Sequence, residues 1–274
     1  MAAEGMPFPW RWDGGTISTN LDGIWGMSVE MIGDNRPTAY THALLNTHDI
    51  LKLLEDFVMI LVGQYDSPFV RRVAIALNHY GIAFERHILS VFQDFDEMLD
   101  INPLGKVPAL ILPGGGHLYD SRAIIEYLEG TVPTDRRLTL NDGALRRDML
   151  CVEAVGVGLA EKIYERAIEF SRRSPGTQDP VWINRLERQI DRTLEWLEGR
   201  LNSDWFVGDE MTRADIAAAV AVTYVVEKLP KHFDDARFPQ LAAHRKRCEG
   251  LPAFSSAAYS ASEALATGWR PEAE

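Results

Sequence analysis

A proline stands where a β-strand should begin, in the run Asn102–Leu110, which reads NPLGKVPAL. Pro108 follows Val107 directly, and only a peptide bond before proline adopts the cis form at little cost. A cis turn here leaves the backbone of Val107 unpaired and facing outward, where it can pair like a strand with a small peptide. The feature therefore predicts a backbone-binding turn at the start of a strand.

A second element that can bind an anion follows closely. A helix is expected over 121–129, with Asp120 and Ser121 at its start. A helix N-terminus offers free N–H groups and a partial positive charge to an anion. Together with Val107 and Pro108, this helix start predicts a backbone clamp beside a carboxylate pocket. A small acidic peptide requires both, and glutathione is a ligand of that kind.

The length of 274 residues is enough for about two domains. No apolar run approaches the ~20 residues of a membrane helix, and no signal peptide opens the chain, so we expect a cytoplasmic protein without a membrane partner. Cys151 and Cys248 form no CxxC motif, which argues against a disulfide framework. The net charge of −12 argues against general nucleic-acid or membrane-surface binding, although local donors can still bind one small anion.

Residues 1–58 differ from the rest of the chain because they show no sustained periodicity. Only 42–57 looks helical there, with a stripe of leucine and isoleucine. A compact domain can start at Met59. Two interpretations remain open for residues 1–58: a dispensable extension, flexible or not native to the protein, and an arm that docks on the body or on a partner.

From Met59 the expected order is strand, helix, strand, helix, strand, strand, helix, which is an α/β pattern. Strands are expected over 59–65, 84–89, 107–112 and 117–119, and helices from Pro68 to the stop signal at Gly81, over 92–99 and over 121–129. The glycine run 113–116 leads into a strand rather than a helix. It therefore indicates a hairpin turn and not a phosphate loop.

The chain after a linker at 131–141 is expected to be all helical, over 144–172, 182–201 and 216–227. The run Met211–Ile216 carries a helix-start signature in which Thr212 and Asp215 cap each other. This capping role accounts for Asp215 without a catalytic one. The apolar helix behind it should form the core of a second domain.

Ser67 is the strongest candidate for chemistry. It lies between the first strand and the first helix, and Pro68 suits the first helical position. One interpretation is a plain N-cap worth about 1 kcal/mol. The other uses the same geometry: a thiol at that helix end meets the helix dipole and a hydroxyl donor, and both favour its thiolate.

Four runs now carry a resemblance to a known family. They read SPFVRRV over 67–73, NPLGKVP over 102–108, DSRAIIEYL over 120–128 and TRAD over 212–215. The first three resemble the glutathione-binding domain of bacterial glutathione transferases, and the last resembles the capped core helix of their C-terminal domain. The resemblance covers about 59–260.

The resemblance implies a thioredoxin-like α/β domain over 59–130, a linker over 131–141, an all-α helical bundle over 142–262 and a tail over 263–274, in a homodimer. Its implied glutathione site places Ser67 as donor to the thiolate, as in serine-type members. Val107 and Pro108 would pair with the cysteinyl unit, Asp120 and Ser121 would hold the γ-glutamyl end, and Lys106 would lie near the glycyl carboxylate. Each residue also has a plain structural interpretation, as core, surface or cap.

One departure from related proteins matters for the reaction. Thioredoxin-like reductases and omega-type glutathione transferases carry cysteine where this chain has Ser67. Serine cannot form the mixed disulfide that thiol exchange requires, which disfavours reductase activity. Tyr65 is a second candidate thiolate donor, although packing as a strand residue is favoured.

The resulting functional prediction is a glutathione transferase with a role in detoxification. Glutathione serves as co-substrate without a permanent cofactor, and its thiolate attacks a small apolar electrophile. An electrophile pocket between the domains is predicted from Tyr65, Asp66, Leu159, Ile163 and Tyr164, with plain core packing as the alternative. A glutathione-dependent isomerase and a non-catalytic binding or assembly module are the other hypotheses.

No metal site is expected. His244 and Cys248 lie four residues apart in a helical stretch and could share one helix face. Two ligands do not make a structural zinc site, and the chain shows no second pair.

Overall fold

The computed structural model describes residues 10–12, 16–19, 28–32, 36–40 and 58–266. The chain divides into two compact units, Met1–Phe57 and Val58–Glu274. The second unit contains every residue assigned to the predicted site.

The first unit contains a four-stranded antiparallel sheet. Its strands are β1 (Trp10–Trp12), β2 (Thr16–Thr19), β3 (Ser28–Ile32) and β4 (Arg36–Tyr40), which pair in sequence order. These strands were not predicted, because three to five residues are too few to establish a period of two. The helix expected over 42–57 lies outside the described residues.

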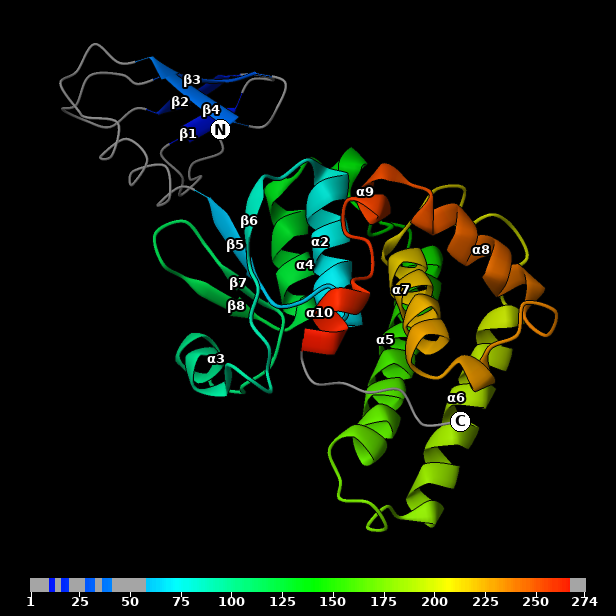
Figure 1. The fold of residues 1–274 in the computed structure, drawn as a ribbon. Coiled ribbons are helices and arrows are strands. Elements are labelled where there is room, and N and C mark those ends of the chain that lie inside the picture. Colours follow the sequence, from blue (N-terminus) through cyan, green and yellow to red (C-terminus); the bar gives the residue numbers. More distant parts are fainter. Residues whose placement is uncertain (1–9, 13–15, 20–27, 33–35, 41–57, 267–274) are drawn as a thin grey trace. The chain divides into compact units, whose positions relative to one another are not determined.

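The second unit begins with a mixed sheet of order β6-β5-β7-β8 (Figure 1). Its strands are β5 (Met59–Val62), β6 (Phe84–His87), β7 (Ala109–Ile111) and β8 (His117–Tyr119). β5 runs parallel to β6 and antiparallel to β7, which is antiparallel to β8. The expected order of strands and helices along the chain from Met59 is confirmed.

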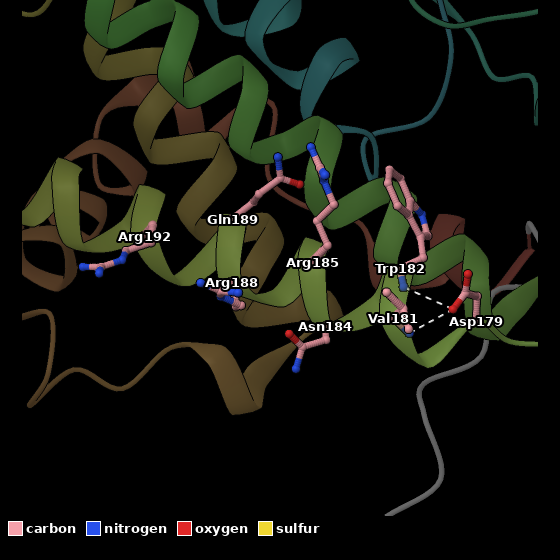
Figure 2. A pocket seen from close by; sticks show the side chains of 8 residues that line it. All are labelled: Asp179, Val181, Trp182, Asn184, Arg185, Arg188, Gln189 and Arg192. Carbon is pink, nitrogen blue, oxygen red and sulfur yellow. Dashed lines mark hydrogen bonds between the residues drawn. The ribbon is translucent and has the colours of Figure 1, made fainter.

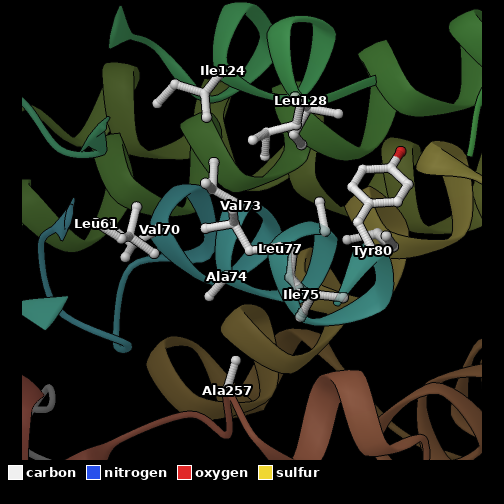
Figure 3. Packing of buried hydrophobic residues seen from close by; sticks show 14 of the residues in the cluster. Leu61, Val70, Val73, Ala74, Ile75, Leu77, Tyr80, Ile124, Leu128 and Ala257 are labelled. Carbon is white, nitrogen blue, oxygen red and sulfur yellow. The ribbon is translucent and has the colours of Figure 1, made fainter. Parts of the chain in front are cut away.

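Helices cover both faces of this sheet (Figure 1). On one face, Leu61 and Leu110 pack with helices α2 (Pro68–Tyr80) and α4 (Ser121–Thr131), as the core view in Figure 3 shows in part. On the other face, their strand neighbours Val62 and Ala109 pack with Met98 of α3 (Phe95–Ile101). Successive residues of each strand thus pack into cores on opposite faces of the sheet, because side chains alternate between the two faces along a strand.

Several element boundaries differ by one to three residues from the sequence-based expectation, and two of these differences have a clear local cause. β5 ends at Val62 rather than at 65, because Gly63 turns the chain with φ +127°. A Cβ at Gly63 would lie 2.6 Å from Val70 Cγ2, so the turn also needs glycine for space. α3 starts at Phe95 rather than at 92, since the Asp94 carboxylate accepts the Ser90 N–H at 2.9 Å and fixes a turn before it.

The predicted hairpin turn is confirmed. Gly114 and Gly115 both have positive φ, and the Leu112 N–H donates to the Gly116 carbonyl at 2.6 Å. Positive φ costs glycine nothing, which explains the glycine run without a phosphate ligand.

The rest of the second unit is helical, as expected. It contains α5 (Gly143–Ser171), α6 (Pro180–Glu198), α7 (Arg213–Lys228), α8 (Pro239–Glu249), α9 (Pro252–Ser255) and α10 (Ala261–Ala266), with single 3-10 turns at Thr134–Arg136 and Pro230–His232. α7 is buried along nearly its whole length. α5 crosses it at Gly156, where a Cβ would lie 2.9 Å from the backbone of Ala217.

The predicted capping box at the start of α7 is also confirmed. The Thr212 side chain accepts from the backbone of the first turn, and Asp215 Oδ2 accepts the Thr212 N–H at 2.8 Å. Asp215 Oδ1 also accepts the Phe206 N–H at 2.9 Å. None of the described helices is long and apolar enough to cross a bilayer.

A buried ionic cluster joins the α/β part to the helical part. Glu153 of α5 pairs with Arg72 of α2 and, at 3.1 Å, with Arg213 of α7. Arg213 also pairs with Glu126 of α4 at 2.8 Å and lies 3.6 Å from Glu129. Glu153 is the centre of this cluster, because removing it would leave the buried Arg72 and Arg213 short of a counter-charge.

Candidate functional site

The strand register brings three predicted segments to one end of the sheet. Val62 at the end of β5 pairs with Ala109 at the start of β7, and Ala109 pairs with Tyr119 at the end of β8. Ser67 follows β5, Val107 and Pro108 precede β7, and Asp120 and Ser121 follow β8. The segments lie far apart in sequence, yet their backbones converge at this end.

Ser67 caps α2, as both interpretations of it require. Its Oγ accepts the Val70 N–H at 3.4 Å, a long hydrogen bond, and Pro68 occupies the first turn. Within 58–266, no acceptor is found for the hydroxyl proton of Ser67, whose side chain is half-buried. The oxygen can therefore cap the helix while its proton is donated to a ligand.

The Val107–Pro108 peptide bond is cis, which confirms the prediction for this turn. Among the described residues, no hydrogen bond uses the backbone N–H or carbonyl of Val107. A Cβ at Gly63 would lie 2.9 Å from Val107 Cβ, so this turn lies directly beside the loop that leads to Ser67.

At the start of α4, Asp120 is the cap and Ser121 is not. Asp120 Oδ1 accepts the N–H groups of Arg122 and Ala123 at 2.8 and 3.2 Å. Ser121 is buried, and its Oγ accepts a hydrogen bond from Arg72 Nη1 at 3.1 Å. The interpretation of Ser121 as a plain cap is thus wrong, because its hydroxyl binds an arginine of the neighbouring helix.

Lys106 is exposed, and its backbone is held in place. The Asn102 side chain donates to the Lys106 carbonyl at 2.6 Å, and the Gly105 N–H donates to the Asn102 carbonyl at 2.8 Å. The loop before the cis turn therefore has a fixed path while its lysine faces solvent.

Tyr65 is buried in a turn and is not a strand residue. Its ring lies under the Arg86 guanidinium, 3.5 Å from the ring centroid. Burial raises the pKa of the Tyr65 phenol, the Arg86 charge opposing it only in part. A phenol that resists ionisation is explained by packing, which is the role that the sequence favoured.

Asp66 pairs with Lys228 at the end of α7, with 3.4 Å between Oδ2 and Nζ. Burial raises the pKa of Asp66 and lowers the pKa of Lys228, while each partner's charge opposes these shifts. Asp66 thus links the segment 63–67, called the Ser67 loop below, to the helical core.

The remaining residues assigned to an electrophile pocket lie on α5. Leu159 and Ile163 are buried in the helical core, which is the alternative that the sequence left open, and Tyr164 is partly exposed. Their assignment to a substrate pocket stays a prediction. A separate groove lies along α6, lined by Asp179, Val181, Trp182, Asn184, Arg185, Arg188, Gln189 and Arg192 (Figure 2). It includes none of the predicted site residues.

His244 and Cys248 do share one face of α8. His244 Nε2 lies 3.1 Å from Asp215 Oδ1 and 3.6 Å from Cys248 Sγ, all in the core. Burial raises the pKa of the Cys248 thiol, as do the charges of Asp215 and Glu249. Among the described residues, no three histidine, cysteine or carboxylate side chains are grouped as a metal site would require.

Comparison with known proteins adds to this geometry. The glutathione S-transferase N-terminal domain model matches residues 61–136, and the C-terminal domain model matches 181–252. The GST-like protein YibF of Escherichia coli K12 is 32% identical over 173 residues, which span 61% of this chain and 82% of that protein. The chain belongs to the glutathione S-transferase family. A probable maleylacetoacetate isomerase of Vibrio cholerae is 30% identical over 212 residues, covering 73% of this chain and 95% of that protein.

Solved structures of the family share the fold. A glutathione S-transferase from Methylobacterium radiotolerans, in complex with glutathione sulfonate, is 30% identical with a TM-score of 0.68, over 73% of this chain and 93% of that one. One from Methylobacillus flagellatus with glutathione bound has the same identity and TM-score, over 74% and 100%. The expected thioredoxin-like domain followed by a helical domain is confirmed.

Three residues near the predicted site of this glutathione S-transferase family member were missed from the sequence. Arg72 donates to Ser121, Glu153 pairs with Arg72, and Glu263 contacts the Ser67 loop. The only signal for Arg72 was a charged residue among apolar neighbours in the run 67–73. Glu263 is separated from its partner by 198 positions, so no local pattern marks it.

Proposed function

We propose that this protein is a serine-type glutathione transferase that binds glutathione at the end of the β5-β7-β8 sheet and activates its thiol beside Ser67. The observation that carries the proposal is the Ser67 hydroxyl, which caps α2 and keeps its proton available. A thiolate at that point accepts this proton as a hydrogen bond and gains from the positive end of the α2 dipole.

The other contacts follow from the backbone. Val107 offers an unpaired N–H and carbonyl to the cysteinyl unit, in the manner of an added strand. The start of α4 holds the γ-glutamyl end, with the Asp120 carboxylate toward its ammonium group and the Ser121 N–H toward its carboxylate. Lys106 provides a cation for the glycyl carboxylate. Relatives of the same fold that hold glutathione or glutathione sulfonate support glutathione as the ligand.

In the reaction, the thiolate attacks an electrophilic carbon and forms a carbon–sulfur bond. A leaving group departs with the electron pair, or, in an addition, the adjacent carbon takes a proton. We propose that the second substrate is a small electrophile bound beside Tyr65 and Asp66, with Tyr164 at its far side, and that the protein acts as a cytoplasmic homodimer.

A second candidate is a glutathione-dependent isomerase, in which the thiolate adds to a double bond and is later expelled. The names of two relatives favour it: the Vibrio cholerae protein and a maleylacetoacetate isomerase of Pseudomonas aeruginosa, which is 28% identical over 206 residues. The chemistry at Ser67 is the same in both reactions.

The test is an ultraviolet titration of bound glutathione against pH in the wild type and in Ser67→Ala. In the wild type, we expect a thiol pKa lowered by about two, which corresponds to roughly 2.7 kcal/mol of preferential thiolate binding. In Ser67→Ala, we expect most of this shift to disappear while glutathione still binds. Turnover should fall far more than affinity, because the Val107 and α4 contacts remain.

Asp142→Ala is the matched control, because it also removes a helix N-cap, that of α5, without touching the site. Each loss should cost about 1 kcal/mol of stability. If the pKa of the bound glutathione thiol in Ser67→Ala equals that in Asp142→Ala, the proposal of a catalytic role for Ser67 is wrong. If glutathione does not bind to the wild type, the binding or assembly module takes its place.

A further inference from the structure

The Ser67 loop is held from outside by the last described helix, α10. The Tyr65 N–H donates to Glu263 Oε2 at 2.6 Å, and Gln64 Nε2 donates to the Glu263 carbonyl at 3.1 Å. Figure 1 shows α10 beside the start of α2. One residue of α10 thus binds two consecutive residues of the loop.

The carboxylate of Glu263 is itself fixed. Arg86, at the end of β6, donates from Nη2 to both of its oxygens at 3.1 and 2.9 Å. The Arg86 guanidinium also covers the Tyr65 ring at 3.5 Å. Arginine, carboxylate and backbone N–H therefore form a closed arrangement around Tyr65, and its hydrogen bonds to charged groups are stronger than neutral ones.

This arrangement is continuous with Ser67. The Ser67 N–H donates to the Gln64 carbonyl at 3.1 Å, which closes a turn over 64–67. Inside that turn, Asp66 is paired with Lys228. Each residue of the turn is thus held by a hydrogen bond or an ion pair.

We infer that α10 is a clamp on the Ser67 loop. Glu263 is then a positioning residue, which keeps the Ser67 hydroxyl directed toward the glutathione thiolate. The positioning role rests on the proposed function, whereas the clamp itself does not. Glu263 takes no part in the chemistry, because its carboxylate is already bound by Tyr65 and Arg86.

The first test measures the clamp without reference to activity. Hydrogen exchange of the peptide segment 63–67 is followed by mass spectrometry in the wild type, Glu263→Ala and Glu195→Ala. Glu195 is the matched control, a carboxylate that pairs with Arg192 and Arg237 on the helical part. We expect roughly tenfold faster exchange in Glu263→Ala, the size of a lost hydrogen bond to a charged group, and no change in Glu195→Ala.

The second test measures positioning. In Glu263→Ala, we expect the pKa of bound glutathione to rise toward its free value and kcat to fall about tenfold with little change in KM. Glu263→Gln, whose amide oxygen still accepts the Tyr65 N–H, should recover much of the loss. Affinity for S-methylglutathione, which has no thiol, should stay unchanged.

The outcomes separate the two ideas. Unchanged exchange over 63–67 in Glu263→Ala would overturn the clamp. Faster exchange with unchanged thiol pKa and kcat would overturn the positioning role. A wild type that never lowers the thiol pKa, but whose loop loosens in Glu263→Ala, would overturn the proposed function and leave the clamp in place.

Discussion

At the scale of single residues, the proposed function gives one hydroxyl group two purposes. The Ser67 oxygen accepts from the backbone of α2, and its proton points to no described acceptor. Ser121 differs in its donor, because its Oγ accepts from the side chain of the buried Arg72 rather than from the backbone of its own helix. Residue identity alone does not separate these roles, since both serines stand at helix starts.

The two cysteines give a residue-scale prediction. Cys151 is exposed, whereas Cys248 is buried with a raised thiol pKa. In the native protein at pH 8, a thiol reagent should modify Cys151 at least about a hundredfold faster than Cys248, because Cys248 is buried and its thiol pKa is raised. Mass spectrometry after timed quenching gives the two rates. A fast thiol that persists in Cys151→Ser would contradict the burial of Cys248.

At the scale of elements, caps and turns explain where helices and strands begin and end. The α7 start follows from the capping box, and the end of β5 follows from Gly63. These devices act over a few residues, so the sequence located most boundaries to within three positions. It failed at β1–β4, where strands of three to five residues carry too little pattern.

The cap of α7 gives a prediction at this scale. Asp215→Ala should destabilise the protein by about 3 kcal/mol or more, because the N–H groups of Thr212 and Phe206 lose their acceptor in the core. Asp179→Ala, which removes the exposed cap of α6, should cost only about 1 kcal/mol. Urea unfolding curves measure both losses. Equal losses would show that burial of the α7 cap contributes nothing.

At the scale of the whole molecule, charge pairs join parts that the chain order keeps apart. Glu153 pairs with arginines of α2 and α7, and Glu263 pairs with Arg86 of β6. Both clusters end at the predicted glutathione site, one at Ser121 and the other at Tyr65. The helical part therefore supports the site through contacts with the α/β part.

The two compact units give a prediction for the whole chain. A protein that starts at Val58 should stay soluble, melt within a few degrees of the full chain and be retained equally on immobilised glutathione, because the second unit contains all residues of the proposed site and its own cores. Thermal melting and glutathione elution measure this. Insoluble protein, or a large loss of melting temperature, would favour the docking-arm interpretation of residues 1–58.

The sequence by itself determined the local devices and their order: the Ser67 cap, the Val107–Pro108 turn, the helix start at Asp120, the capping box of Thr212 and Asp215, and hence the fold. Each of these features depends on residues a few positions away, so it can be predicted from the local sequence. Only the tertiary structure decided which partners these residues meet: Arg72 for Ser121, Lys228 for Asp66 and Glu263 for Tyr65. Such partners are chosen by packing across the molecule, where burial and charge compensation act between positions that no local pattern connects.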